Sequence, residues 1–352
     1  SAVNYYGEAV SNYIQSIYKS LKHVFGEVKA TPGTTMYFFA SPSSGNITLD
    51  PENLAKRFQH RKIRTKYFSP WHFSSVLEPF QVRLVEKELN ENLEEVPLNL
   101  DVHPVSYLYN MELHAGREGE NEAFWLGWIK KIHLAHAIVF LVILQGVVFI
   151  AALKKKRSSE GYRRFSVLYA IATTGLCGMS AEILFLYLFQ NIYGSMYQKI
   201  GMFIASFMAG LALGGFGATR FLEKFPLNIK GSQKALFYLE VLLWFYLLAA
   251  GYFVPEFKPA EGIFYLLILA TGILTGAEFP LGAECLRLSG EKAGKAAGAL
   301  DASDHIGAAT GSLLIGVALI PAIGIPRAIY VLAFLKLTSA TAVYIQKTNS
   351  GS

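Results

Sequence analysis

Cysteine is scarce in this sequence, and the placing of its two cysteines excludes two kinds of framework. Only Cys177 and Cys285 occur in 352 residues, and both lie within apolar runs. Structural zinc sites and disulfide-rich scaffolds need several cysteines at short and regular spacing. The sequence therefore predicts neither a cysteine metal site nor a disulfide framework. The first six residues also lack the charged start and the apolar core of a secretory signal peptide.

Charged residues are also few, and they are unevenly distributed. They make up 16% of the chain, whereas hydrophobic residues make up 52%, a balance more apolar than that of an average soluble protein. Residues 1–125 are mixed in character, while residues 126–352 are mostly long apolar runs. We therefore expect two parts: an N-terminal α/β segment over 1–125 and a transmembrane helical domain over 126–352.

Seven apolar runs are long enough to cross a bilayer as helices, which takes about 20 residues each. They cover roughly 132–153, 166–190, 200–221, 235–254, 262–284, 303–321 and 327–345. The run at 303–321 is rich in glycine and has an acidic start. The predicted fold is an α-helical membrane bundle of about seven transmembrane helices with an N-terminal α/β segment.

The net charge of +6 comes largely from short loops between the apolar runs. Lysine and arginine gather after the first, third and fifth runs, in the loops around residues 154–164, 220–234 and 287–295. Basic loops mark the cytoplasmic side of a membrane protein. We therefore expect a cytoplasmic or inner membrane location, with residues 1–125 on the non-cytoplasmic side, and no nucleic-acid partner.

Small residues mark the stretch from Gly175 to Gly215. It reads as two apolar helices joined by a short polar turn. Gly175, Gly178 and Ala181 lie in the first helix, and Ala205, Ala209, Gly210, Gly214 and Gly215 lie in the second. Since lipid provides no hydrophobic force between helices, small residues that allow close backbone approach supply the packing. The sequence predicts a tightly packed helical hairpin.

The N-terminal segment begins with a predicted strand over residues 1–7 that nothing upstream covers. An amphipathic helix over 9–25, two strands at 27–31 and 34–41, a basic helix over 51–66 and a helix ending near residue 92 follow. An exposed strand edge invites pairing with another chain, and Ser1 is not a methionine. We expect a processed or split chain in a hetero-oligomeric complex, partnered by a preceding segment or by another protein.

The motifs of both parts resemble the membrane-bound spermidine-synthase-like family. In the membrane part these are G-x-x-x-M-x-x-E from Gly175, Y-G-S-x-Y from Tyr193, FMAGLALGG from Phe207, FPLGAE from Phe279, ALDASDHIGAATGSLL from Ala299, and P-x-x-G from Pro321. In the N-terminal part, LKHVFGEVKATPGTTMYFFAS resembles the closing half of the Rossmann-like aminopropyltransferase domain, and NLDVHPVSYLY resembles the segment that follows it.

The resemblance implies an incomplete transferase. The family's glycine-rich loop, which holds decarboxylated S-adenosylmethionine, and its catalytic aspartate would lie upstream of Ser1. No G-x-G-x-x-G sequence occurs in 1–125. We therefore expect no catalytic residue and no cofactor on this chain, with the donor bound through an upstream half. The alternative is a non-catalytic membrane anchor, or scaffold, of a multi-subunit and redox-linked complex.

Ionisable residues within the apolar runs are candidate sites, because burying them costs about 2.5–3.5 kcal/mol unless they face a partner or a cavity. Glu182, Glu278, Asp301, Asp304 and His305 form this set. Converging acids could bind a cationic polyamine. The simpler interpretations are that Glu182 fixes helix packing and that Asp301 or Ser303 caps the sixth helix.

In the N-terminal part, Tyr37, Asp101, His103 and Tyr107 are candidate substrate-binding residues, although aromatic residues in such number are more often core. His133 and His136 lie three residues apart on one helical face. Paired with His305 they could hold a haem, but histidines at a membrane interface are commoner than ligands. No metal site is predicted.

Overall fold

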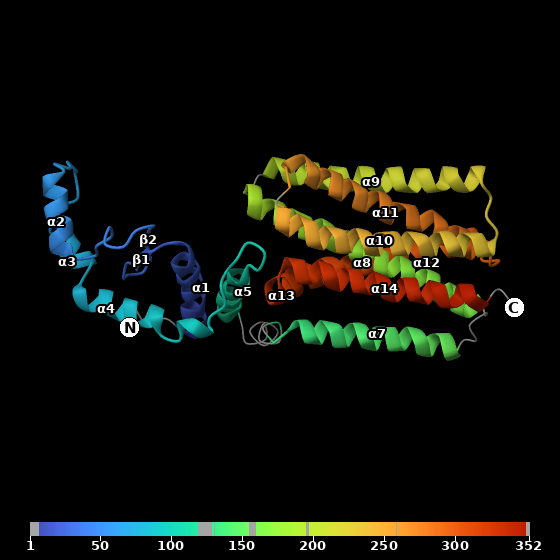
Figure 1. Ribbon diagram of the computed structural model, residues 1–352, viewed down its shortest axis with the longest axis horizontal. Coiled ribbons are helices and arrows are strands. Elements are labelled where there is room, and N and C mark those ends of the chain that lie inside the picture. Colours follow the sequence, from blue (N-terminus) through green and yellow to red (C-terminus); the bar gives the residue numbers. More distant parts are fainter. Residues whose placement is uncertain are drawn as a thin grey trace. The chain divides into compact units, whose positions relative to one another are not determined.

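The computed structural model describes residues 7–118, 129, 131–154, 160–194, 197–257 and 259–349. Contacts divide the chain into two compact units, Ser1–Lys130 and Lys131–Ser352. Figure 1 shows their different character: the N-terminal unit mixes short helices with a small sheet, and the C-terminal unit is entirely long helices. The boundary expected near residue 125 falls outside the described residues.

The N-terminal unit contains one small sheet among short helices. Its elements are α1 (Glu8–Val24), β1 (Glu27–Ala30), β2 (Phe38–Ser41), α2 (Pro51–His60), α3 (His72–Val76), α4 (Pro79–Asn90), the 3-10 turn η1 (Leu93–Glu95) and α5 (Val105–Glu118). β1 and β2 pair antiparallel, with Glu27 opposite Ser41 and Ala30 opposite Phe38. The predicted helix and strand pair are confirmed, while the strand expected over 1–7 lies outside the description.

Two helices of this unit end differently from the sequence expectation. α2 stops at His60 instead of continuing to residue 66, because Lys62 adopts a left-handed conformation with φ of 52° that no helix can contain. The sequence predicts no helix after residue 92 in this unit, whereas the structure has α5 from Val105.

The core of the N-terminal unit lies between α1, the sheet and α4. Tyr18, Val28, Ala30, Val85 and Leu89 are buried together there. Polar contacts fix α1 against the end of α4: the buried Gln15 side chain donates to the carbonyls of Glu88 and Glu91, both at 2.8 Å. The amphipathic face of α1 therefore packs against the β1–β2 sheet and the end of α4.

The C-terminal unit contains the seven predicted spans. They are α7 (Leu134–Lys154), α8 (Glu160–Tyr193), α9 (Tyr197–Lys224), α10 (Ile229–Phe257), α11 (Glu261–Arg287), α12 (Ala293–Leu313) with its continuations η2 (Leu314–Leu319) and α13 (Ile320–Ile323), and α14 (Ile325–Asn349). Each of the seven is long and apolar enough to cross a membrane. The chain is therefore an integral membrane protein.

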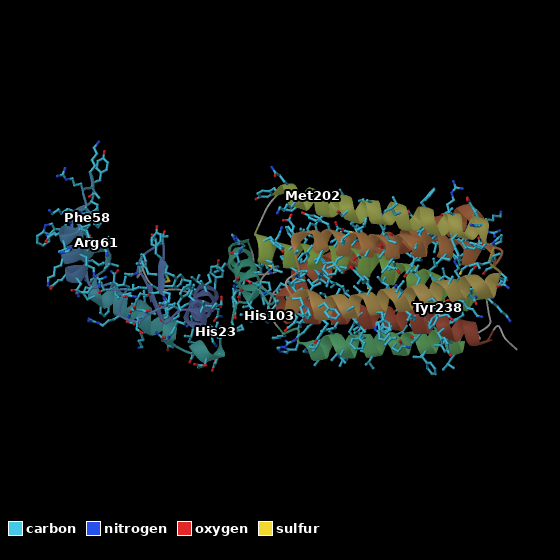
Figure 2. All side chains as sticks on the ribbon, turned by 45° about the horizontal axis from the view of Figure 1, so that its top comes forward. His23, Phe58, Arg61, His103, Met202 and Tyr238 are labelled. Carbon is cyan, nitrogen blue, oxygen red and sulfur yellow. The ribbon has the colours of Figure 1, made fainter. Side chains whose placement is uncertain are left out.

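The outer surface of this bundle is apolar. Met202 on α9 and Tyr238 on α10, both labelled in Figure 2, are exposed, as are many large aliphatic and aromatic side chains of α7. Exposed apolar surface of this extent on long helices is what a hydrocarbon solvent requires.

The sixth span begins earlier than expected, which changes the interpretation of its acidic residues. α12 starts at Ala293, so Asp301 and Ser303 lie inside the helix and cap nothing. The Ser303 hydroxyl instead donates to the carbonyl of Ala299 at 2.8 Å. The helix extends backwards through residues 293–299, where four alanines favour a helix and two glycines disfavour it.

The small residues of α8 and α9 pack against other helices rather than against each other. A Cβ atom on Gly210 or Gly214 of α9 would collide with carbonyl oxygens of α11. Likewise, Gly307 and Gly311 of α12 lie against the backbone of α8, and Gly175 of α8 lies against Asp304. Close backbone approach thus builds two helix pairs, α9–α11 and α8–α12, in place of the predicted tight hairpin.

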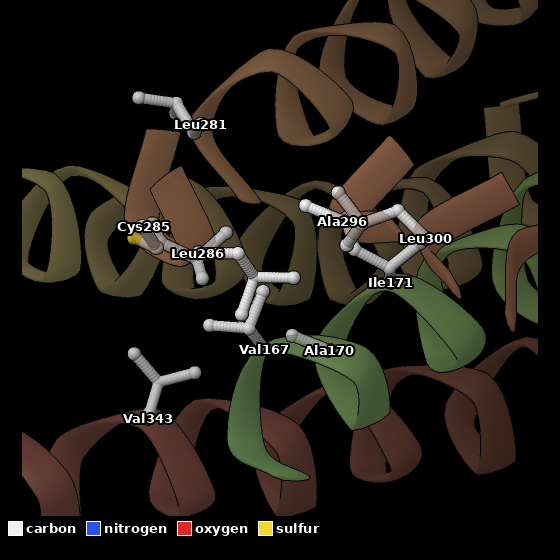
Figure 3. Packing of buried hydrophobic residues seen from close by; sticks show 10 residues of the cluster. Val167, Ala170, Ile171, Leu281, Cys285, Leu286, Ala296, Leu300 and Val343 are labelled. Atoms are coloured by element: carbon white, nitrogen blue, oxygen red, sulfur yellow. The ribbon is translucent and has the colours of Figure 1, made fainter. Parts of the chain in front are cut away.

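A hydrophobic cluster lies inside the bundle near the end that carries the connections 224–229 and 287–293, hereafter the basic end. Figure 3 shows Val167 of α8, Leu286 of α11, Leu300 of α12 and Val343 of α14 meeting there. Cys285 belongs to the same cluster, and both cysteines are buried and free.

Candidate functional site

Three ionisable side chains from three helices meet inside the bundle. Lys336 comes from α14, Glu240 from α10 and Glu278 from α11, and none has any exposed side-chain surface. The Lys336 Nζ atom lies 2.8 Å from Glu240 Oε1 and 3.4 Å from Glu278 Oε1. The 2.8 Å contact is an ion pair between two fully buried side chains. One ammonium group therefore sits between two carboxyl groups.

Two hydroxyl groups complete this charge cluster (Lys336, Glu240, Glu278, Thr174 and Ser339). The Lys336 ammonium donates to Thr174 Oγ1 of α8 at 2.7 Å, and the Thr174 hydroxyl contacts Glu278 Oε2. The Ser339 hydroxyl, one turn along α14, donates to Glu240 Oε2. The charge cluster thus joins α8, α10, α11 and α14, each through at least one polar contact.

Further polar side chains of α8 flank the charge cluster. The Tyr169 hydroxyl lies 2.6 Å from Thr338 Oγ1, and the Cys177 thiol contacts the carbonyl of Leu332 at 3.6 Å. Tyr169 and Cys177 are the other titratable groups close enough to Lys336 to feel its charge. The surroundings of the charge cluster are therefore polar on the α8 and α14 sides.

The complete burial of the charged side chains limits what the charge cluster can do. An isolated charge in a bilayer interior is costly, so intramembrane ionisable residues pair with one another and often mark functional positions. Here the partners are complete, with every charged atom group held by another charge or a hydroxyl. The charge cluster holds charge and protons away from water; its side chains offer no surface to a dissolved substrate.

Of the predicted intramembrane residues, only Glu278 belongs to the charge cluster. Glu182 of α8 is buried, and the polar contacts found among the described residues include none to its carboxyl group. Asp301 and His305 lie on the exposed side of α12, with His305 Nδ1 3.6 Å from Asp301 Oδ1. Asp304 is partly buried beside Gly175. The structure thus separates this set and shows no convergence of acids around a common point among the residues it describes.

Sequence reasoning missed Glu240 and Lys336, the two residues that complete the site. The signal was present in the sequence, since each is a single ionisable residue within a long apolar run. Which helices face one another decides that these two residues meet Glu278, and residue type alone does not carry that information.

The predicted site in the N-terminal unit stays a prediction. Tyr37 precedes β2 and its backbone amide donates to Thr31 Oγ1 at 2.9 Å. Asp101 and His103 lie in the turn closed by the bridge between Leu100 and His103, which Figure 2 locates by the His103 label, and Tyr107 follows in α5. No described cavity is lined by Tyr37 together with the other three.

A cavity of the N-terminal unit lies elsewhere, between β1, the start of α2 and α4. It has a volume of about 410 Å³, and its charged lining residues are Glu27, Lys29, Asp50, Arg83 and Glu86. The Lys29 ammonium is 3.2 Å from Glu86 Oε1. Carboxylates and cations alternate around this cavity, so it favours neither an anion nor a cation.

The described part of the chain contains no cluster of side chains suited to bind a metal ion. No group of three or more potential ligand side chains gathers there. The rings of His133 and His136 are tilted at 31° to each other with centroids 5.8 Å apart, and His136 Nδ1 accepts from the backbone amide of His133. That hydrogen bond places His136 at the start of α7 as a helix-end residue.

Comparison with known proteins gives no relative. No family model, curated protein or solved structure matches this chain. Its function must therefore be argued from its own residues.

Proposed function

We propose that this chain is the membrane-embedded C-terminal part of a spermidine-synthase-like protein and is not catalytic alone. The motifs from Gly175 to Gly324 and from Leu21 to Ser41 support the kinship. In the N-terminal unit, a helix followed by an antiparallel strand pair is the order in which an aminopropyltransferase sheet would end. The donor-binding loop would come from an upstream half.

The small size of the sheet is the observation that supports this proposal. β1 and β2 have four residues each and form a two-stranded sheet, and such a hairpin is only marginally stable alone. Large side chains of this unit are also uncovered: Phe39 in β2 is 48% exposed, Trp71 is 84% exposed and Phe80 is 64% exposed. Extended strand edges and large apolar surfaces mark protein contacts. We infer that further strands cover them.

A second candidate is a membrane anchor that has lost transferase activity. The closed charge cluster supports it, because buried charges without exposed surface fix helix packing and do not bind dissolved substrates. The predicted sidedness also supports it, since a nucleotide-derived donor is made in the cytosol and residues 1–125 are expected on the other side. In this role the chain would hold partner subunits at the membrane.

Site-specific photocrosslinking in native membranes tests the proposal. A photoreactive residue replaces Phe39 on β2, and a matched control replaces the lipid-facing Tyr238 on α10. We expect Phe39 to capture a protein segment of strand character with a glycine-rich loop near it in sequence, and Tyr238 to capture lipid. Capture of lipid alone from Phe39, or of this chain alone, would contradict a completed sheet.

The purified assembly then separates the two candidates. It is supplied with decarboxylated S-adenosylmethionine and a diamine, and transfer of the aminopropyl group is followed by mass spectrometry. Transfer supports the synthase role. A complete assembly that binds no donor and transfers nothing supports the anchor.

A further inference from the structure

The charge cluster contains more acid than base. Two carboxyl groups, Glu240 and Glu278, lie against the single ammonium of Lys336, at 2.8 Å and 3.4 Å from its Nζ atom. The remaining titratable groups facing the cluster are Tyr169 and Cys177 of α8, which are neutral acids. With both carboxyls ionised, the cluster would carry a net negative charge in the membrane interior.

We propose that Glu240 and Glu278 share one exchangeable proton, so that the charge cluster is a proton-binding site inside the membrane. One proton on the carboxyl pair makes the cluster neutral, and two carboxyls that approach each other cannot both ionise without strong repulsion. The proton is held by one or the other of the two carboxyl groups, while the remaining negative charge stays paired with Lys336. This inference is independent of the synthase role.

A second feature, on the same helix, is a pair of buried polar side chains without hydrogen-bond partners among the described residues. Gln233 and Ser232 of α10 are 1% and 0% exposed, yet both amide atoms of Gln233 and the hydroxyl of Ser232 have no hydrogen-bond partner among the described protein groups. Buried polar groups are normally bonded to protein or to buried water. Because the glutamine amide has donors and an acceptor, it fits the polar partners that a buried water needs.

Along α10, Gln233 lies between the basic end and the level of the charge cluster. Gln233 lies four residues after the start of α10 at Ile229, and Glu240 lies seven residues further on. At 1.5 Å per residue, Gln233 is about 6 Å from the helix start and about 10 Å from the level of Glu240. Seven residues are close to two full turns, so the two side chains project from the same side of α10. We assign to Gln233 the hydrated step between the basic end and the carboxyl pair.

Infrared spectroscopy of the full-length protein in lipid nanodiscs tests the shared proton. A protonated carboxylic acid gives a C=O stretching band that is separate from the amide and carboxylate bands and moves on transfer to D₂O. We expect this band in the unmodified protein at neutral pH. Glu240→Gln and Glu278→Gln should each abolish or shift it, whereas Glu182→Gln should leave it in place. A missing band, or one that only Glu182→Gln removes, overturns the proposal.

The route is tested by the rate at which the band moves after a rapid change into D₂O. Gln233→Leu removes the amide that would hold water, and we expect it to slow the exchange about tenfold or more, since the apolar replacement leaves no partner for water. Gln145→Leu is the matched control, because Gln145 of α7 is a second glutamine of the bundle, bonded to Thr341 and away from the charge cluster. Equal rates for Gln233→Leu and the unmodified protein overturn the assigned route. Unchanged thermal midpoints of the variants show that the fold is retained.

Discussion

Lys336 places its ammonium group deep in the bundle. It lies eleven residues after the start of α14 at Ile325, about 16 Å along the helix axis. Glu240 likewise lies eleven residues after the start of α10 at Ile229, and α10 starts at the end of the bundle opposite to the start of α14. The ion pair therefore sits near the middle of both helices, where water offers no compensation for a lost partner. Through its polar contacts, Lys336 of α14 holds together side chains from α8, α10 and α11.

Replacing Lys336 with methionine should destabilise the protein strongly. Methionine has a side chain of similar length, but it leaves two buried carboxyl groups without their cation. We expect this to lower the free energy of unfolding by about 3–5 kcal/mol. Thermal unfolding in nanodiscs measures it. Lys292→Met, at an exposed lysine of the basic end, is the matched control and should change little. Adding Glu240→Gln to Lys336→Met should recover part of the loss, and a double variant as unstable as the sum of both singles would contradict the ion pair.

Glu88 gives a residue-scale prediction outside the membrane. Burial and the neighbouring Glu91 raise the pKa of Glu88 above its ordinary value of 4.5. The unfolded chain has the ordinary value, so the stability that protonated Glu88 contributes is present below pH 4.5 and is lost as the pH rises through the raised pKa. Glu88→Gln should therefore protect α4 at neutral pH and give no gain below pH 4.5.

Hydrogen exchange of the α4 amides in the full-length protein checks the Glu88 prediction. Glu91→Gln removes the second cause of the raised pKa and should give a smaller gain at neutral pH. An equal change for Glu88→Gln on both sides of its titration would show that lost contacts, and not charge, are responsible.

Among the residues of the charge cluster, sequence reasoning reached only Glu278, because it is an acid in an apolar run. It did not reach Glu240 or Lys336, although both satisfy the same criterion. The family resemblance directed attention to the motifs around residues 175–215 and 279–324, and neither of the missed residues lies in those motifs. Pairing across α10, α11 and α14 depends on helix rotation, which hydropathy does not determine.

At the scale of elements, glycine decides how closely α9 and α11 approach. Gly210 and Gly214 of α9 meet Gly272 and Gly276 of α11, and each lies against a carbonyl or backbone atom of the facing helix. The contact is made by main chain atoms, so dispersion between backbones replaces side-chain packing. A Cβ atom added to any of these four glycines would force the two helices apart.

Gly214→Ala should therefore destabilise the α9–α11 pair. The added Cβ would collide with the backbone of Ile273, and overpacking of this kind costs about 1–3 kcal/mol. Gly217→Ala is the matched control, three residues further on the same helix, where a Cβ meets no atom within 4 Å. Since alanine is the better helix former, the control should be neutral or slightly stabilising. Thermal unfolding of both variants in nanodiscs compares them, and equal destabilisation would show that the crossing is not responsible.

The elements themselves were largely accessible from hydropathy and periodicity. The seven spans, the amphipathic helix before β1 and the antiparallel strand pair follow from apolar runs and turn residues. The start of α12 was wrong because hydropathy marks the apolar run and not the helix, which extends back through residues 293–299. The partners of the glycines were wrong because neighbours in sequence were taken as neighbours in space.

At the scale of the whole molecule, chain connectivity and loop charge predict how the protein lies across the membrane. Seven spans place the connections after α7, α9 and α11 on one side and those after α8, α10 and α13 on the other. The first set carries most of the lysine and arginine of the loops and is predicted to be cytoplasmic. The N-terminal unit precedes the first span and is expected on the opposite side.

Cysteine labelling in intact cells tests this arrangement. Cys177 and Cys285 are buried, so introduced cysteines should react against a low background. Tyr197→Cys, at the 89% exposed first residue of α9, and Trp71→Cys, at an 84% exposed residue of the N-terminal unit, should both react with a membrane-impermeant maleimide added outside. Lys292→Cys in the basic end should react only after the membrane is opened, because positively charged loops stay inside. Reaction of Lys292→Cys alone would reverse the orientation and place the N-terminal unit beside the cytosolic supply of donor, and reaction of Trp71→Cys without Tyr197→Cys would contradict the seven spans.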